Sequence, residues 1–121
     1  MHASKPTVLV VDDDAALRML MRVNLELEGF SVAESATVEE TEAAVRRSRP
    51  GAVLLDVHLG GRDTLTLLAW LRAKGIPVAL VTGSVDIDEY RESADGVLTK
   101  PFTPQALVEL ARRLARVEHE A

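Results

Sequence analysis

Five short apolar runs, rich in β-branched residues, recur at nearly even intervals along the chain. They are Thr7–Val11, Phe30–Ala33, Ala52–Leu55, Pro77–Val81 and Gly96–Leu98. Their first residues stand 23, 22, 25 and 19 positions apart, which leaves room for a helix between neighbours and is far more than a tight hairpin needs. The runs are continuously apolar, as is typical of parallel strands covered on both faces. The pattern therefore predicts an α/β fold in which a doubly wound, five-stranded parallel sheet carries helices on both faces.

The segments between the runs carry the signals of helices. We expect helices over Ala15–Glu28, Val38–Ser48, Asp63–Lys74 and Asp88–Ser93, and a last one that begins after Thr103. Asp14 and Thr103 are residue types that cap helix N-termini, and Gly29 and Gly75 are typical of helix ends. The repeated strand–helix order, with no linker, predicts one domain over residues 1–121 with its core at about residues 7–116 and no output domain in this chain.

Composition narrows the classes of function. Asp and Glu number 19 against 14 for Lys and Arg, so the formal net charge is −5, and the chain has no cysteine. Without cysteine, disulfides, thiolate metal sites and cysteine nucleophiles are excluded. A net acidic chain with 3% aromatic residues lacks the features of most nucleic-acid-binding domains, so we expect no direct nucleic-acid contact. The apolar runs are far shorter than the ~18 residues of a membrane span, so we expect a cytoplasmic protein with no membrane contact.

Polar residues gather where the predicted strands end. Asp12, Asp13 and Asp14 follow the first run, Asp56 the third, Thr82 the fourth and Lys100 the fifth. Taken singly, each has an ordinary explanation, such as a helix cap, a turn hydroxyl or a surface lysine. Because the carboxyl ends of parallel strands meet at one edge of the sheet, where ligands of α/β proteins bind, the full set predicts a functional site.

This set of groups suits phosphoryl transfer assisted by a divalent cation. Clustered carboxylates repel one another, and a bound hard cation relieves that repulsion. Mg²⁺ prefers oxygen ligands and is usually held by one or two carboxylates together with a phosphate. A hydroxyl and an ammonium group would then contact the phosphoryl oxygens, and a carboxylate can itself accept the phosphoryl group. Asp56 is the natural acceptor because it lies on the middle strand.

Four motifs carry a resemblance to a known family. They are Val8–Asp14 (VLVVDDD), Val53–Asp56 (VLLD), Pro77–Gly83 (PVALVTG) and Lys100–Phe102 (KPF). In order and spacing they resemble the receiver domain of two-component response regulators, from about Thr7 to Leu114. The resemblance implies a flavodoxin-like sheet with the strand order 2-1-3-4-5. It also implies a phosphorylation-operated signalling switch that changes the surface near the fourth and fifth strands and the last helix.

The resemblance further implies a role for each site residue. Asp56 would accept the phosphoryl group from a phosphohistidine of a sensor histidine kinase or a histidine phosphotransfer protein. Mg²⁺ would be held by Asp13 directly, by Asp12 largely through water, by Asp56 and by the backbone carbonyl of His58. Thr82 would be the switch hydroxyl and Lys100 the partner of the phosphate, with a cis peptide bond between Lys100 and Pro101. Such a domain is no enzyme beyond its own phosphorylation and dephosphorylation.

The chain departs from the family pattern at two places. After the acceptor, the family usually shows a Met-Pro pair and then Asp-Gly, whereas this chain reads Leu59-Gly60-Gly61-Arg62-Asp63-Thr64. Gly60 in place of proline predicts a more flexible loop. On the fifth strand, Val97 stands where the family often has Tyr or Phe, so we expect switching to run through the backbone of the loop after Thr82. The other two histidines lie near the termini, so we expect the His58 imidazole to be an exposed group rather than a metal ligand.

Two other classes of function are weighed against the switch. A Mg²⁺-dependent phosphohydrolase on a similar α/β sheet would need a second acid two residues after the first, where this chain has His58. A phosphate-independent adaptor would not need the complete set of Asp, Thr and Lys. The preferred hypothesis is a receiver that passes its signal to a separate downstream effector. It leaves open a homodimer and an origin in a longer protein.

Overall fold

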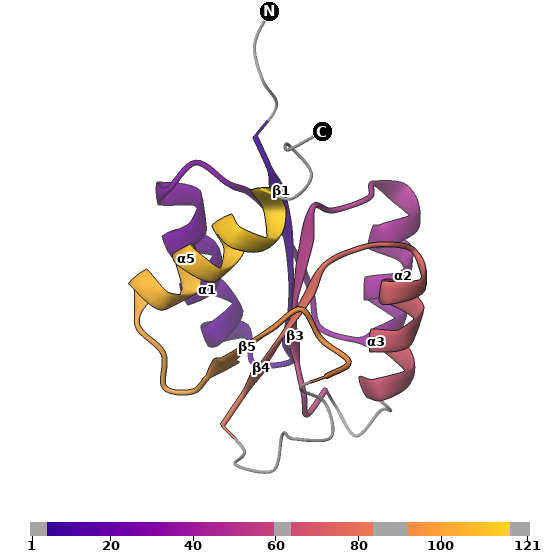
Figure 1. The fold of residues 1–121 in the computed structure, drawn as a ribbon. Helices are drawn as coiled ribbons and strands as arrows, with labels where there is room; N and C mark the ends of the chain where they lie inside the picture. The colour runs from indigo at the N-terminus through magenta and orange to yellow at the C-terminus, as the bar shows by residue number, and fades with distance from the viewer. Residues whose placement is uncertain (1–4, 60–63, 84–91, 117–121) are drawn as a thin grey trace, which may run out of the picture.

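Five parallel strands form one sheet in the computed structural model of the chain, which describes residues 5–59, 64–83 and 92–116. The strands are β1 (Thr7–Val11), β2 (Ser31–Ser35), β3 (Ala52–Asp56), β4 (Val78–Thr82) and β5 (Gly96–Thr99). The described helices are α1 (Ala15–Leu27), α2 (Val38–Arg47), α3 (Thr64–Ala73) and α5 (Pro104–Arg116). The strand order β2-β1-β3-β4-β5 confirms the predicted topology. Figure 1 shows α1 and α5 on one face of the sheet and α2 and α3 on the other.

Two apolar layers, one on each face of the sheet, make up the core. The layer under α1 and α5 contains Met21, Leu25 and Leu107, and the layer under α2 and α3 contains Leu67 and Leu71. Successive residues of β1, β3 and β4 alternate between the two layers, as the pleat of a strand requires. Because both faces are covered, the three central strands are buried along almost their whole length, as their continuous apolar runs predict.

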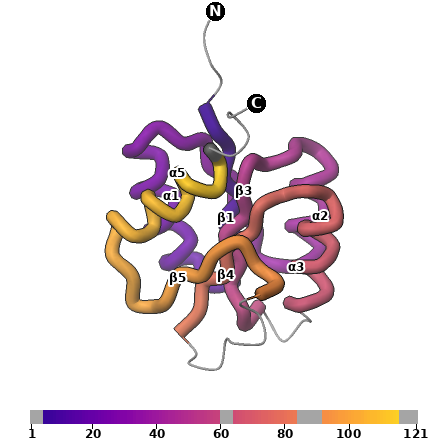
Figure 2. Tube along the Cα trace, in the orientation of Figure 1, coloured from indigo at the N-terminus to yellow at the C-terminus, as the bar shows by residue number. Residues whose placement is uncertain are grey.

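The strand register aligns the carboxyl ends of the central strands. Val11 of β1 pairs with Leu55 of β3, so the residue after Val11 lies beside the end of β3. Asp56 pairs with Val81 of β4, and Thr82 pairs with Thr99 of β5. The tube in Figure 2 follows these strands to the same end of the molecule. The predicted gathering of polar residues at one sheet edge is therefore confirmed.

Two strands begin one residue later than the sequence predicts, and four strands, β2 to β5, run on one or two residues further. The second strand begins at Ser31 rather than Phe30 and runs on to Ser35, because this edge strand pairs only with β1 and alternates in exposure instead of being continuously apolar. The fourth strand begins at Val78 rather than Pro77, since proline has no amide hydrogen to donate to the ladder. The carbonyl of Pro77 still accepts a hydrogen bond from the Val53 amide at 2.9 Å.

The helix termini follow the predicted capping residues. The Asp14 carboxylate accepts hydrogen bonds from the amides of Ala16 and Leu17, and the Thr103 hydroxyl accepts one from Ala106. Most of the predicted helix Asp88–Ser93, and the Gly60–Gly61 loop, lie outside the described residues. Within the described residues, every helix falls short of the length and hydrophobicity that crossing a bilayer would require.

Candidate functional site

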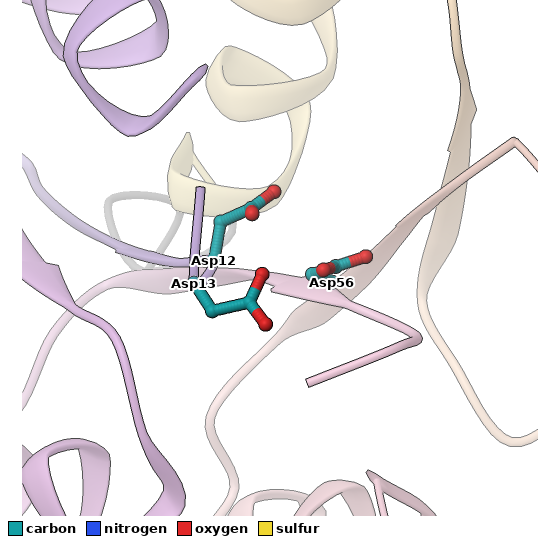
Figure 3. Close-up of side chains that lie close together, drawn as sticks. All are labelled: Asp12, Asp13 and Asp56. Atoms are coloured by element: carbon teal, nitrogen blue, oxygen red, sulfur yellow. The ribbon is translucent and has the colours of Figure 1, made fainter. Parts of the chain in front are cut away.

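Three carboxylates lie together where β1 and β3 end. Asp12 and Asp13 follow β1, Asp56 ends β3, and one oxygen of each lies within 4.8 Å of the others (Figure 3). Asp12 and Asp56 are buried, whereas Asp13 is exposed to solvent. The sequence prediction that these three acids meet is confirmed. Such a group of oxygen ligands with one open side suits a hard divalent cation.

Backbone hydrogen bonds set the position of the acid pair. The Asp12 amide continues the β1–β2 ladder by donating to the Ser35 carbonyl at 3.1 Å. The Asp14 amide donates to Asp12 Oδ1 at 2.8 Å, while the Asp14 side chain caps α1. The chain therefore passes from strand to helix within three residues, and this tight turn places Asp12 and Asp13 beside Asp56.

Asp12 is a buried acid whose two carboxylate oxygens differ in their hydrogen bonds. Its Oδ2 atom has no hydrogen-bond partner among the described residues, although the side chain is only 1% exposed. Burial raises the pKa of the Asp12 carboxyl, and the charges of Asp56 and Asp13 raise it further, against the lowering effects of the Asp14 amide and Lys100. A cation at this position would give Oδ2 a partner and relieve the repulsion, so the residues present fit a bound Mg²⁺.

Lys100 lies between the two buried acids. Its Nζ atom is 3.6 Å from Asp12 Oδ2 and 3.6 Å from Asp56 Oδ1. The Lys100 amide donates to the Thr82 carbonyl at 2.8 Å, and the Lys100–Pro101 peptide bond is cis, as the family resemblance implies. The ammonium group thus faces the acceptor carboxylate from the end of β5.

Thr82 and His58 lie at the same edge of the sheet. The Thr82 side chain is fully buried at the end of β4, one position beyond the strand partner of Asp56. The His58 amide lies 3.3 Å from Asp56 Oδ1, and the His58 side chain is exposed, as predicted. Within the described part of the chain, the group of side chains that could hold a metal ion consists of Asp12, Asp13 and Asp56. Val97 is half-buried on β5 and pairs with Leu80.

Two residues that support the site escaped the sequence analysis. Arg18 on α1 donates to the Asp12 carbonyl at 2.7 Å, and its Nε atom is 3.0 Å from the Glu34 carboxylate of β2. The Thr64 hydroxyl donates to the Val57 carbonyl at 2.7 Å. Arg18 lies one helical turn after the N-cap residue Asp14. This spacing is the sequence feature that could have indicated its contact with the Asp12 carbonyl. Thr64 stands where the family usually has glycine, which marked it as unusual without indicating its partner.

Comparisons with known proteins agree with the fold and the site. The family model for the response regulator receiver domain matches residues 8–112. The DNA-binding response regulator MtrA of Mycobacterium bovis is 36% identical to this chain, in a match that covers 99% of this chain and 55% of MtrA. The transcriptional regulatory protein AruR of Pseudomonas aeruginosa is 38% identical to this chain, in a match that covers 94% of this chain and 51% of AruR. The chain thus spans about half the length of these curated relatives.

A solved structure gives the same result. The crystal structure of a CheY-like response regulator receiver domain protein from Methanospirillum hungatei matches with a TM-score of 0.86 and 29% identity. The match covers 98% of this chain and all of that one, at 100%. Together with the family model, this match favours a receiver over the alternative of a Mg²⁺-dependent phosphohydrolase.

Proposed function

The chain belongs to the receiver domains of two-component response regulators, and we propose that Asp56 is the residue whose phosphorylation operates this signalling switch. One observation carries the assignment. Asp56 is the carboxylate at the end of the central strand β3, and the Lys100 ammonium lies 3.6 Å from it. The same ammonium group also pairs with Asp12. A phosphoryl group on Asp56 would therefore lie beside a positive charge that is already in position.

Three carboxylates and one carbonyl are the proposed Mg²⁺ ligands. Asp13 would bind the ion directly, Asp12 largely through water, and Asp56 and the His58 carbonyl would complete the protein's share. The unpartnered Oδ2 atom of buried Asp12 and the closeness of the three acids support this ligand set. Bound Mg²⁺ supplies charge neutralisation for the oxygens of the phosphoryl group during its transfer.

The protein's own residues then account for the transfer. A carboxylate oxygen of Asp56 forms a bond to phosphorus as the phosphorus–nitrogen bond of the donor phosphohistidine breaks, and the imidazole leaves with its electron pair. Lys100 pairs with a phosphoryl oxygen, and the Thr82 hydroxyl donates a hydrogen bond to another. Hydrolysis of the acyl phosphate by water returns Asp56 to its resting form.

A non-enzymatic signalling role fits this family, because the phosphoryl group ends on the domain itself. The donor is a histidine kinase, or a histidine phosphotransfer protein that relays from one. The signal then passes through the surface near β4, β5 and α5 to a downstream effector, in the cytoplasm. A homodimer through that surface is a further candidate for the output state.

The test is an intact-mass spectrum after incubation with a small phosphoryl donor and Mg²⁺. The wild-type chain should gain one phosphoryl mass, and Asp56→Asn should gain none. The matched control is Asp95→Asn, which removes a carboxylate just before β5, at the opposite edge of the sheet. The control should take up the group like the wild type. Full modification of Asp56→Asn would overturn the assignment, and turnover of a generic phosphatase substrate would revive the phosphohydrolase.

A further inference from the structure

We propose that Thr64 is a positioning residue for the metal site, acting through the backbone of Val57–Leu59. Its hydroxyl would hold this segment so that the His58 carbonyl stays in place beside Asp56. The inference rests on the proposed function in one respect, namely that the His58 carbonyl is a Mg²⁺ ligand. Thr64 is not one of the site residues described above, which are Asp12, Asp13, Asp56, Thr82 and Lys100.

The contact is short and shielded from water. Thr64 is the first residue of α3 and is 4% exposed. Its Oγ1 atom donates to the Val57 carbonyl at 2.7 Å, between two buried residues. A buried carbonyl that loses a hydrogen-bond donor keeps the cost of desolvation, so removing this donor is unfavourable. The hydroxyl therefore ties the start of α3 to the residue directly after the phosphoryl acceptor.

Two further anchors act on the same short segment. The Val57 amide donates to the Val81 carbonyl of β4 at 3.2 Å, which extends the β3–β4 ladder past Asp56. Leu59 is 1% exposed and packs in the core layer under α3. His58 thus lies between two held neighbours while its own side chain is exposed. With Val57 and Leu59 fixed, the peptide that carries the His58 carbonyl has little freedom to turn away.

The residue type at position 64 makes this tie possible. Glycine at this position would have no hydroxyl to offer. The Thr64 side chain links the start of α3 to the residue directly after Asp56.

The experiment compares three variants that separate the loss of the Thr64 hydroxyl from other changes to a buried threonine. Thr64→Val keeps the shape of the side chain and removes the donor, and Thr64→Ser keeps the donor. Thr41→Val is the matched control, because Thr41 is also buried and its hydroxyl donates to a backbone carbonyl, that of the α2 N-cap residue Thr37, at 2.8 Å. Two readouts are measured for each chain: Mg²⁺ affinity by NMR titration, and amide hydrogen exchange at His58 and Leu59 without metal.

Thr64→Val should lose about tenfold in Mg²⁺ affinity, the lower end of the usual effect of a group that orients a metal ligand. Its His58 and Leu59 amides should exchange faster than in the wild type. Thr64→Ser should keep wild-type values in both measurements, and so should Thr41→Val, even where its thermal stability falls. If Thr64→Val binds Mg²⁺ as tightly as Thr41→Val does, the proposal is wrong.

A measurement on the wild-type chain covers the case in which Thr64→Val does not fold. A buried, hydrogen-bonded hydroxyl proton exchanges slowly with water, so the Thr64 hydroxyl should give an observable NMR signal close to Val57. A hydroxyl in rapid exchange with solvent would overturn the proposal. The positioning role and the proposed function fail in different ways. If Asp56 is phosphorylated but the Mg²⁺ affinity does not depend on the Thr64 hydroxyl, only the positioning role is wrong. If Asp56 is not phosphorylated but the Thr64 variants behave as expected, only the phosphorylation is wrong.

Discussion

At the scale of single residues, the buried charges of the site lower the stability of the domain when no ligand is bound. Two buried acids lie beside an exposed third, and one lysine is shared between the buried pair. Among the described residues, Asp12 Oδ2 accepts no hydrogen bond and has only the ion pair with Lys100 at 3.6 Å, so the burial of this charge is incompletely compensated. A binding site that is costly without its ligand is strongly stabilised when the ligand binds.

The pH dependence of stability should report this cost at Asp12. Because burial raises the pKa of Asp12 above 3.8, the folded state binds its proton more tightly than the unfolded state does. Without metal at pH 7, Asp12→Asn should therefore melt at a higher temperature than the wild type. The gap should narrow as the pH falls through the raised pKa toward 3.8, where the wild-type acid becomes neutral. A gap that is the same at every pH would contradict this explanation.

Asp13 should matter to the cation and little to the fold. Its side chain is exposed and supplies one of the three converging oxygens. Asp13→Ala should weaken Mg²⁺ binding by more than the ~tenfold expected for Thr64→Val, because a ligand is removed and not a group that orients one. Its melting temperature without metal should equal or exceed that of the wild type, because a like charge has been removed. The control Asp95→Asn should titrate with Mg²⁺ as the wild type does; an unchanged titration for Asp13→Ala would remove it from the ligand set.

At the scale of elements, α1 connects the acid pair to the edge of the sheet. Arg18 and Arg22 both pair with Glu34 of β2, at 3.0 and 2.7 Å, and Arg18 also holds the Asp12 carbonyl. The helix begins after the Asp14 cap and ends at Leu27, and Gly29, just beyond the C-cap Glu28, has a φ of +96° in the region that favours glycine. Both ends of α1 are thus specified by local chemistry, and its contact with β2 includes two ion pairs to Glu34.

The end of α1 gives a prediction that isolates backbone conformation. A Cβ atom at Gly29 would meet nothing within 4 Å, so a substitution there costs conformational energy and no packing. Gly29→Ala should lower the free energy of unfolding by about 1 kcal/mol in urea titrations. Gly29→Asn should cost less, since asparagine adopts positive φ more readily. Equal stability of Gly29→Ala and the wild type would mean that the end of α1 rearranges freely.

At the scale of the whole molecule, the site joins strands from the centre to the edge of the sheet. Asp12 follows β1 and Asp56 ends β3, whereas Thr82 ends β4 and Lys100 follows β5. The Lys100 amide donates to the Thr82 carbonyl. Any group bound to Asp56 that attracts the Lys100 ammonium therefore acts on the β4–β5 side. The β1–β2 side is instead braced by Arg18 and Arg22.

Amide hydrogen exchange with beryllofluoride and Mg²⁺, a mimic of the phosphorylated state, should show this asymmetry. Protection should change at Gly83 and along Gly96–Thr99, with little change along Ser31–Ser35. Lys100→Met should reduce the response of β5, because the ammonium that would follow the phosphoryl mimic is missing. Changes confined to the β1–β2 side of the sheet would place the output surface elsewhere.

Much of the domain is determined by local sequence. The spacing of the apolar runs, the caps Asp14 and Thr103 and the stop at Gly29 predicted the strands and helices closely, because each depends on a residue's immediate neighbours. The boundaries of β2 and β4 shifted by a residue or two, since pairing with β1 and the missing amide of Pro77 decide them. The acids, Thr82 and Lys100 were predictable as a group, because parallel strands bring their carboxyl ends to one edge.

Tertiary structure alone decided how these groups are held. The pattern of the sequence does not reveal that Asp12 is buried with an unpartnered oxygen, that Lys100 lies equally far from two acids, or that Arg18 binds the Asp12 carbonyl. Nor does it reveal that the Thr64 hydroxyl meets Val57. Periodicity and capping act over a few residues along the chain. Burial and cross-strand contacts depend on the packing of two helical layers against one sheet, which brings together atoms that no local pattern relates.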